Sequence, residues 1–184
     1  IIQDLGVDGG VGHVYEYGGE AIEALDMEGR LAVCNMSIEG GARAGYINPD
    51  ETTYDYLEGR EYAPEGEAFE ERKEYWESIK SDEDAEYDDV VTVDADGIDP
   101  LVTWGINPGQ VIEISDTVPE PEDFEARTDR EAAEQALDHM DIEPGQSMVG
   151  YDVDVAFLGT CTNGRVSDFE EAAKILEGRT VDED

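Results

Sequence analysis

One cysteine lies where a thiol could do chemistry, in a glycine-rich turn between an apolar run and a helical pattern. Cys161 stands in the stretch FLGTCTNGR, residues 157–165. Many free cysteines are plain packing residues. A nucleophilic thiol needs a base, and neither of the chain's two histidines is near it in sequence. A metal site needs more ligands than one thiol. Position alone therefore leaves packing residue, nucleophile and metal ligand open.

A second group of polar residues lies in CNMSIEGGARAG, residues 34–45. If residues 35–40 are helical, Asn35 and Glu39 share one face of the helix. An amide beside a carboxylate can orient a hydroxyl and accept or relay its proton. The alternative is a solvated polar pair, which is common for these residue types. The planar guanidinium of Arg43 suits a carboxylate ligand, and its alternative is a structural ion pair.

A third stretch, DPLVTWGINPGQ at residues 99–110, holds two prolines and two glycines around Trp104 and Asn107. It predicts a shaped loop that either walls a pocket or simply connects two strands. His13, in the glycine-rich segment near the start, is a candidate polar contact. A structural role is the more common one for a lone histidine, and it is the one expected for His139.

The elements around Cys161 read as strand, turn and helix. The segment at residues 154–158, which is apolar from Val155 onward, predicts a buried strand. A helix is expected at residues 168–177, with Ser167 and Glu170 as a capping box. Cys161 would then lie at the carboxyl end of a strand, where open α/β sheets place their ligands.

Strands alternating with helices along the whole chain predict an α/β fold with mostly parallel sheets. A domain boundary is expected near residues 80–88. Phe69, Tyr75, Trp76 and Ile79 are expected to be the apolar anchors of an acidic helix. The patterns predict helices at residues 19–27, 35–40, 50–58 (begun by Asp50 and stopped by Gly59), 67–80 and 129–140, strands at 31–34, 89–93 and 111–114, and loops at 41–47 and 119–124.

The charge of the chain is extreme, with 49 acidic against 11 basic residues and a net charge of −38. Such an excess is typical of disorder or of a salt-adapted surface. Hydrophobic residues make up 39% in recurring patterns, which disfavours disorder. Molar salt shortens the screening length to about 3 Å and removes most self-repulsion. We therefore expect a halophilic protein, and no nucleic acid bound through a basic face.

No apolar run has membrane-spanning length, and no signal-peptide pattern is present. Two cysteines do not make a disulfide framework, which favours a reducing, cytoplasmic setting. The sequence begins with Ile1 and ends at Asp184 directly after a helical pattern. We therefore expect a piece of a longer protein.

Four segments, in this order, resemble the aconitase superfamily over nearly the whole chain: GGVGHVYEYGGEAI, MEGRLAVCNMSIEGGARAGYINPDETTYDYL, VTWGINPGQV and FLGTCTNGRVSDFEEAA. CNMSIE and the CTN triplet are superfamily hallmarks, whereas GARAG, PDETTYDYL and VTWGINPGQ favour its isopropylmalate branch. The resemblance implies three-layer α/β domains. Residues 1–85 would be the C-terminal portion of one, and residues 86–184 the start of the next, with the first cluster cysteine.

That resemblance implies a hydro-lyase that interconverts 2-isopropylmalate and 3-isopropylmalate through 2-isopropylmaleate, in leucine biosynthesis. The family holds a [4Fe-4S] cluster on three cysteines, and one iron acts as a Lewis acid on the substrate. Cys161 matches the first of these cysteines, and the other two belong to a Cys-x-x-Cys pair outside this chain. Asn35 and Glu39 match the active-site segment, Arg43 would bind substrate, and Cys34 would be structural.

A small subunit, the expected partner, supplies the catalytic serine base in this family, so the chain alone is expected to be inactive on its small-molecule substrate. Two rival interpretations remain. The first is homoaconitase or aconitase activity on a related hydroxy acid. The second is a binding or assembly module without a cluster.

Overall fold

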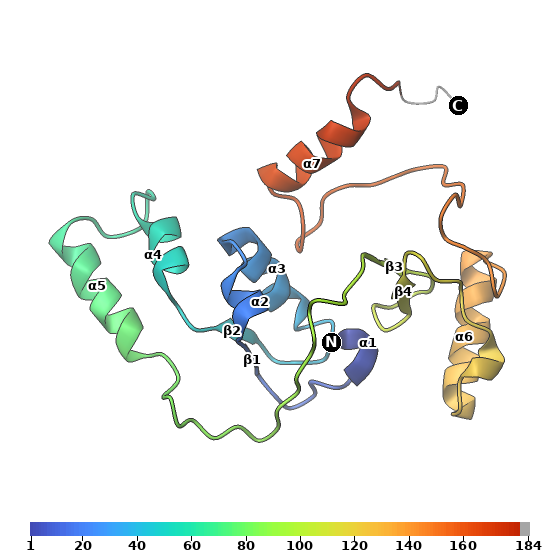
Figure 1. Cartoon of the computed structure of the whole chain (residues 1–184), viewed down its shortest axis with the longest axis horizontal. Helices are drawn as coiled ribbons and strands as arrows, with labels where there is room; N and C mark the ends of the chain where they lie inside the picture. Colours follow the sequence, from blue (N-terminus) through green and yellow to red (C-terminus); the bar gives the residue numbers. More distant parts are fainter. Residues whose placement is uncertain (181–184) are drawn as a thin grey trace. The chain divides into compact units, whose positions relative to one another are not determined.

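The computed structural model describes residues 1–180, which fall into two compact units that alternate along the chain (Figure 1). Unit 1 comprises residues 1–14, 37–43 and 88–154, and unit 2 comprises residues 15–36, 44–87 and the described residues from 155 onward. The expected family-domain boundary near residues 80–88 stays a prediction. None of the helices in residues 1–180 combines the length and the apolar character that a membrane crossing needs.

Unit 2 is built on a β–α–β arrangement. Strands β1 (Tyr15–Tyr17) and β2 (Gly45–Ile47) pair in parallel, with Tyr15 opposite Gly45. Parallel strands need a crossover connection, which here contains the helices α2 (Glu20–Glu23) and α3 (Met27–Met36). Helix α3 packs against β2. The α/β class expected from the sequence is confirmed.

Residues 31–34, expected as a strand, belong to helix α3. Of the helix expected at residues 35–40, only residues 35 and 36 are helical, as the end of α3. A short apolar run fits a strand and a buried helical segment equally well by periodicity. The deciding contact lies upstream, where Asp26 Oδ1 accepts a hydrogen bond from the Gly29 amide at 2.8 Å and caps the helix. The loop expected at 41–47 was also wrong, since it contains β2.

Helices α4 (Glu51–Leu57) and α5 (Glu67–Ser78) confirm two predictions. Asp50 Oδ1 accepts from the Thr53 amide at 3.3 Å, and Gly59 follows the helix with a φ of 72°. The helices pack through aromatic rings, with Tyr54 stacked on Trp76 at 6.0 Å between centroids.

The expected anchors of α5 divide into two pairs. Phe69 is buried and meets Trp76 edge-on at 5.8 Å between ring centroids. Tyr75 and Ile79 are 52% and 49% exposed, so the prediction was wrong for them. The helix therefore packs on α4 through one apolar stripe, the one that contains Trp76 and Phe69, because Trp76 stacks on Tyr54.

A buried arginine joins α3 to the start of α4. Arg30 is 3% exposed and donates to Asp50 Oδ1 at 2.6 Å and to Asp50 Oδ2 at 2.8 Å. It also donates to the carbonyls of Leu25 and Glu23, at 3.0 and 2.9 Å. The hydrogen bonds from Arg30 hold the pKa of the Asp50 carboxyl below its usual range.

Asp50→Asn should lower the free energy of unfolding by about 3 kcal/mol, because it leaves a buried guanidinium without its counter-charge. The matched control is Glu51→Gln, whose ion pair with Lys73 is exposed and should matter by at most about 1 kcal/mol. Both are measured by urea unfolding at constant high salt. Since the folded-state pKa of Asp50 is lowered, its contribution is complete at neutral pH and disappears as pH falls through that pKa. Equal losses in both variants would contradict the buried pairing.

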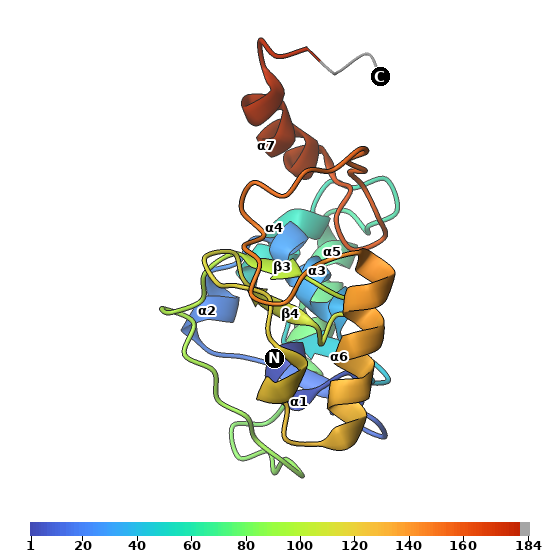
Figure 2. The same ribbon diagram turned by 90° about the vertical axis from the view of Figure 1, so that its right-hand side faces the viewer.

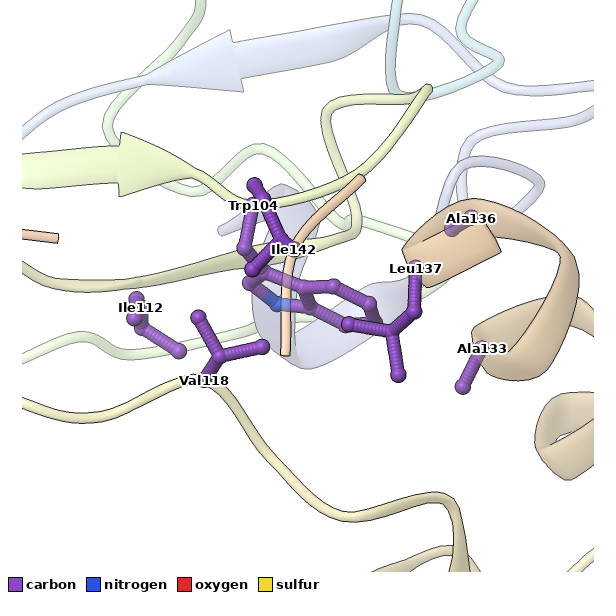
Figure 3. Close-up of a cluster of buried hydrophobic side chains, with 7 residues drawn as sticks. All are labelled: Trp104, Ile112, Val118, Ala133, Ala136, Leu137 and Ile142. Atoms are coloured by element: carbon purple, nitrogen blue, oxygen red, sulfur yellow. The ribbon is translucent and has the colours of Figure 1, made fainter. Parts of the chain in front are cut away.

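Unit 1 packs a hairpin against a long helix (Figure 2). Strands β3 (Leu101–Thr103) and β4 (Val111–Glu113) pair antiparallel, and α6 (Arg127–Met140) lies beside them. The unit also contains α1 (Ile2–Leu5) and the 3-10 turn η1 (Pro121–Asp123). Its buried core, drawn in Figure 3, consists of Trp104, Ile112, Val118, Ala133, Ala136, Leu137 and Ile142.

The hairpin decides between the two roles left open for residues 99–110. Trp104 is 2% exposed and packs in this core, and Asn107 Oδ1 accepts from the Gly109 amide at 2.9 Å. The stretch therefore connects two strands. The sheet is antiparallel, so the expectation of mostly parallel sheets was wrong here. The strand expected at 111–114 and the helix at 129–140 are confirmed, whereas 89–93 forms no strand.

Helix α7 (Val166–Leu176) confirms the expected helix after Cys161, but the strand expected at 154–158 is absent (Figure 1). Val155 and Phe157 are 84% and 83% exposed, because no strand pairs with this segment in the described part of the chain. The expected capping box was also wrong. Asp168 Oδ2 accepts from the Arg165 amide at 2.9 Å instead.

Candidate functional site

The structure brings two of the expected site residues together within unit 2. Asn35 lies in the last turn of α3, and its Nδ2 donates to the Cys161 carbonyl at 3.0 Å. The two residues are 126 positions apart in the chain. Cys161 is exposed and carries a free thiol. The amide therefore holds the backbone of the turn and leaves the sulfur available.

Local hydrogen bonds close the turn around Cys161. The Thr160 amide donates to the Asn163 carbonyl at 2.6 Å, and Arg165 Nη1 donates to the Thr162 carbonyl at 2.7 Å. Gly159 enters the turn with a φ of 112°, a backbone conformation that favours glycine. The turn therefore has a defined shape although no strand precedes it.

Glu39 belongs to unit 1 and follows the end of α3, so it does not share a helical face with Asn35. Its Oε2 atom is buried and has no hydrogen-bond partner among residues 1–180. Buried polar atoms are nearly always paired, and an exception calls for a partner of another kind. A hydroxyl or a water held at this oxygen would satisfy it.

Arg43, also in unit 1, is exposed, and its amide donates to the His13 carbonyl at 2.9 Å. Within the described part of the chain, no carboxylate lies at ion-pair distance from its guanidinium. Arg43 therefore forms no structural ion pair among residues 1–180. The guanidinium is free to meet a carboxylate ligand.

The backbone beside Glu39 and Arg43 is closely packed at a glycine. Gly41 has a φ of 83°, and a Cβ there would lie 2.8 Å from the Val7 carbonyl oxygen. The neighbouring Gly40 carbonyl accepts from the Gly10 amide at 2.8 Å. Residues 37–43 are thus fixed on the glycine-rich segment near the start of the chain.

Gly41→Ala should destabilise unit 1 by about 3 kcal/mol, because strain at positive φ and a backbone clash add together. Gly12→Ala is the matched control, since Gly12 has a φ of 87° but open space around its Cα. It should cost only about 1 kcal/mol, from strain alone. Urea unfolding of both variants checks the difference. Equal losses would show that the contact with Val7 does not constrain the loop.

The second cysteine has a different environment from the first. Cys34 lies half-buried in α3, and burial raises the pKa of its thiol. Metal ligands and nucleophiles act as thiolates, which a raised pKa disfavours. This environment favours the structural role expected for Cys34.

The donor set of the chain suits one part of a metal centre. Residues 1–180 contain no group of three or more His, Cys, Asp or Glu side chains that could hold a metal ion. The exposed Cys161 thiol fits a single ligand position. Any cluster here would need further ligands from elsewhere.

One contact at the turn was missed by sequence reasoning. Ser167 Oγ donates to the carboxylate of Glu28, so α7 is linked to the first turn of α3. The one sequence signal was the spacing of Glu28 and Asn35, seven residues apart on one helix. That spacing has no meaning until the helix over residues 27–36 is known.

Comparison with known proteins gives one family. The profile of the aconitase family (aconitate hydratase) matches residues 1–184. The chain is similar to proteins named 3-isopropylmalate dehydratase large subunit, at 63% identity in Haloarcula marismortui, 61% in Halorubrum lacusprofundi and 58% in Salinibacter ruber. Each match covers 100% of this chain and 39% of the relative. The chain thus spans about two fifths of the length of these relatives.

Proposed function

Because the chain belongs to the aconitase family, we propose that it forms part of the large subunit of an isopropylmalate isomerase. The enzyme would interconvert 2-isopropylmalate and 3-isopropylmalate through 2-isopropylmaleate, in leucine biosynthesis. The observation that carries this function is the hydrogen bond from Asn35 to the Cys161 carbonyl. It joins two family motifs that lie far apart in the sequence.

Enzymes of the aconitase family use a [4Fe-4S] cluster, and we propose Cys161 as one of its three cysteine ligands. The two others would come from a part of the polypeptide outside these 184 residues. When bound, the cluster supplies Lewis-acid chemistry through an iron that keeps an open position. The exposed, unpaired thiol of Cys161 suits this role.

The chain's own residues would hold the turn and handle the substrate's polar groups. Asn35 fixes the Cys161 carbonyl and so orients the turn that carries the thiol. Glu39 offers a buried carboxylate oxygen that can accept the proton of a hydroxyl. Arg43 offers a guanidinium free to bind a substrate carboxylate with two parallel hydrogen bonds.

A small subunit would complete the enzyme by supplying the catalytic serine base, in a reducing compartment such as the cytoplasm. Residues 1–85 and 86–184 would belong to two successive aconitase-like α/β domains. The large acidic excess would keep the surface hydrated in concentrated salt.

The test is an assay of the complete large subunit, purified without oxygen and combined with its small subunit. Its rates with 2-isopropylmalate, homocitrate and citrate are compared at high salt, together with iron content and visible absorption. Preference for 2-isopropylmalate supports the proposal, and preference for homocitrate or citrate overturns the substrate assignment. A folded, colourless and iron-free product would instead indicate a binding or assembly module.

A further inference from the structure

Two hydrogen bonds join helix α3 to the segment around Cys161. Near the end of α3, Asn35 donates to the Cys161 carbonyl at 3.0 Å. In the first turn of α3, the carboxylate of Glu28 accepts from Ser167 Oγ. Glu28 and Asn35 are seven residues apart, so they lie on one face of the helix, two turns and about 10 Å from each other.

Cys161 and Ser167 belong to one piece of structure. Asn163 Nδ2 donates to Asp168 Oδ1 at 3.2 Å, and the Arg165 amide donates to Asp168 Oδ2 at 2.9 Å. These bonds attach the turn that holds Cys161 to the first turn of α7, which contains Ser167. A contact that holds Ser167 in place therefore also limits the movement of the Cys161 backbone.

Two attachment points restrict the turn more than one can. A single hydrogen bond at Cys161 leaves the turn free to rotate about that bond. The second bond lies two helical turns away and removes this freedom. It is also the stronger of the two, since a hydroxyl that donates to a carboxylate makes a charge-assisted bond.

The chain before Cys161 gives the turn little support. Phe157 and Leu158 are 83% and 49% exposed, and residues 154–158 pair with no strand in the described part of the chain. The position of the turn on α3 therefore depends on its polar contacts. Groups that orient metal ligands from behind commonly change metal affinity by about 10- to 100-fold when removed.

We propose that Glu28 and Ser167 are positioning residues that, together with Asn35, hold the Cys161 turn on α3. The purpose of this positioning rests on the proposed function of Cys161 as a cluster ligand. Neither residue touches the thiol. They act through the backbone of the turn and fix where the sulfur is presented.

The test uses the complete large subunit in its cluster-free form. The rate at which iodoacetamide alkylates Cys161 is followed by peptide mass spectrometry for Glu28→Ala, Ser167→Ala and the double variant. Each single change should raise the rate about three- to tenfold, because the turn then samples more open positions. The double variant should react as fast as the faster single variant, since both substitutions remove the same hydrogen bond.

Two further variants control for side effects. Glu28→Gln keeps an acceptor oxygen without the charge and should give an intermediate rate. Glu170→Ala removes an exposed carboxylate from α7, the helix that contains Ser167, and should leave the rate unchanged. No hydrogen bond or ion pair of the Glu170 side chain is present among residues 1–180. Wild-type alkylation rates in Glu28→Ala and Ser167→Ala, or effects that simply multiply in the double variant, would overturn the positioning role.

A second measurement links the pair to the cluster. The loss of iron to a chelator should be about three- to tenfold faster in Ser167→Ala holoenzyme than in wild type. Unchanged iron loss would overturn the link to the cluster. If the wild-type protein binds no iron, the proposed function fails, while the alkylation rates still decide whether Glu28 and Ser167 hold the turn.

Discussion

Cys161→Ala should reduce the proposed isomerase activity of the complete enzyme by more than about a hundredfold and remove most of its iron. Loss of the proposed cluster ligand should exceed the 10- to 100-fold effects typical of residues that only orient ligands. The thiol is free and exposed, and Asn35 holds the carbonyl behind it. Iron content, visible absorption and turnover of 2-isopropylmalate are measured on protein prepared without oxygen.

Cys34→Ala is the matched control, because it removes the same group from the other cysteine. Cys34 is half-buried in α3 with a raised thiol pKa, so the substitution should preserve iron binding and cost only packing energy. Each variant also needs an unfolding curve, which separates loss of the cluster from loss of the fold. Wild-type iron content in Cys161→Ala would remove this residue from the ligand set.

Local signals in the sequence were enough to predict several helices. Asp50 and Gly59 bracket α4 because a cap and a left-handed glycine act within a few residues of the helix they limit. Helices α5, α6 and α7 likewise carry apolar stripes whose period is visible in the sequence. Their boundaries moved by one or two residues, in α7 because Asp168 accepts from the Arg165 amide and sets an earlier start.

Strands were predicted poorly because a strand is defined by its partner. Residues 31–34 have a strand-like composition, yet the Asp26 cap draws them into α3. Residues 154–158 have a still clearer apolar pattern, but no strand pairs with them in the described chain. Residues 45–47 had been expected as a loop and became a strand because β1 pairs with them.

Motifs, and not spacing, point to the candidate site. The CNMSIE and CTN motifs give Asn35, Glu39 and Cys161 by family resemblance, and their roles stay predictions, to which the structure adds the bond between Asn35 and Cys161. The contact of Glu28 with Ser167 depends on how α3 and α7 lie relative to each other. That placement is a tertiary property, and no local pattern encodes it.

The temperature at which half of the protein is unfolded should rise by about 20 °C or more when the KCl concentration increases from 0.1 M to 3 M. The chain carries a net charge of −38, with too few basic residues to pair its carboxylates. The screening length falls from about 10 Å at 0.1 M salt to less than about 3 Å, which removes most of the repulsion between exposed charges. Thermal unfolding followed by circular dichroism measures the change.

Helix α5 is where this repulsion should act most directly. It carries Glu67 and Glu71, and also Glu70 and Glu74, as like-charged pairs four residues apart. By contrast, the part-buried ion pair between Arg30 and Asp50 should change less with salt than these exposed charges. Sucrose is the control, because it favours burial without screening charge. An equal rise of the unfolding temperature in sucrose would assign the effect to solvent exclusion. An unfolding temperature that does not rise with KCl would contradict salt adaptation.

Glu71→Lys and Glu74→Lys should stabilise the chain at low salt and lose that advantage at 3 M KCl, which only charge repulsion predicts.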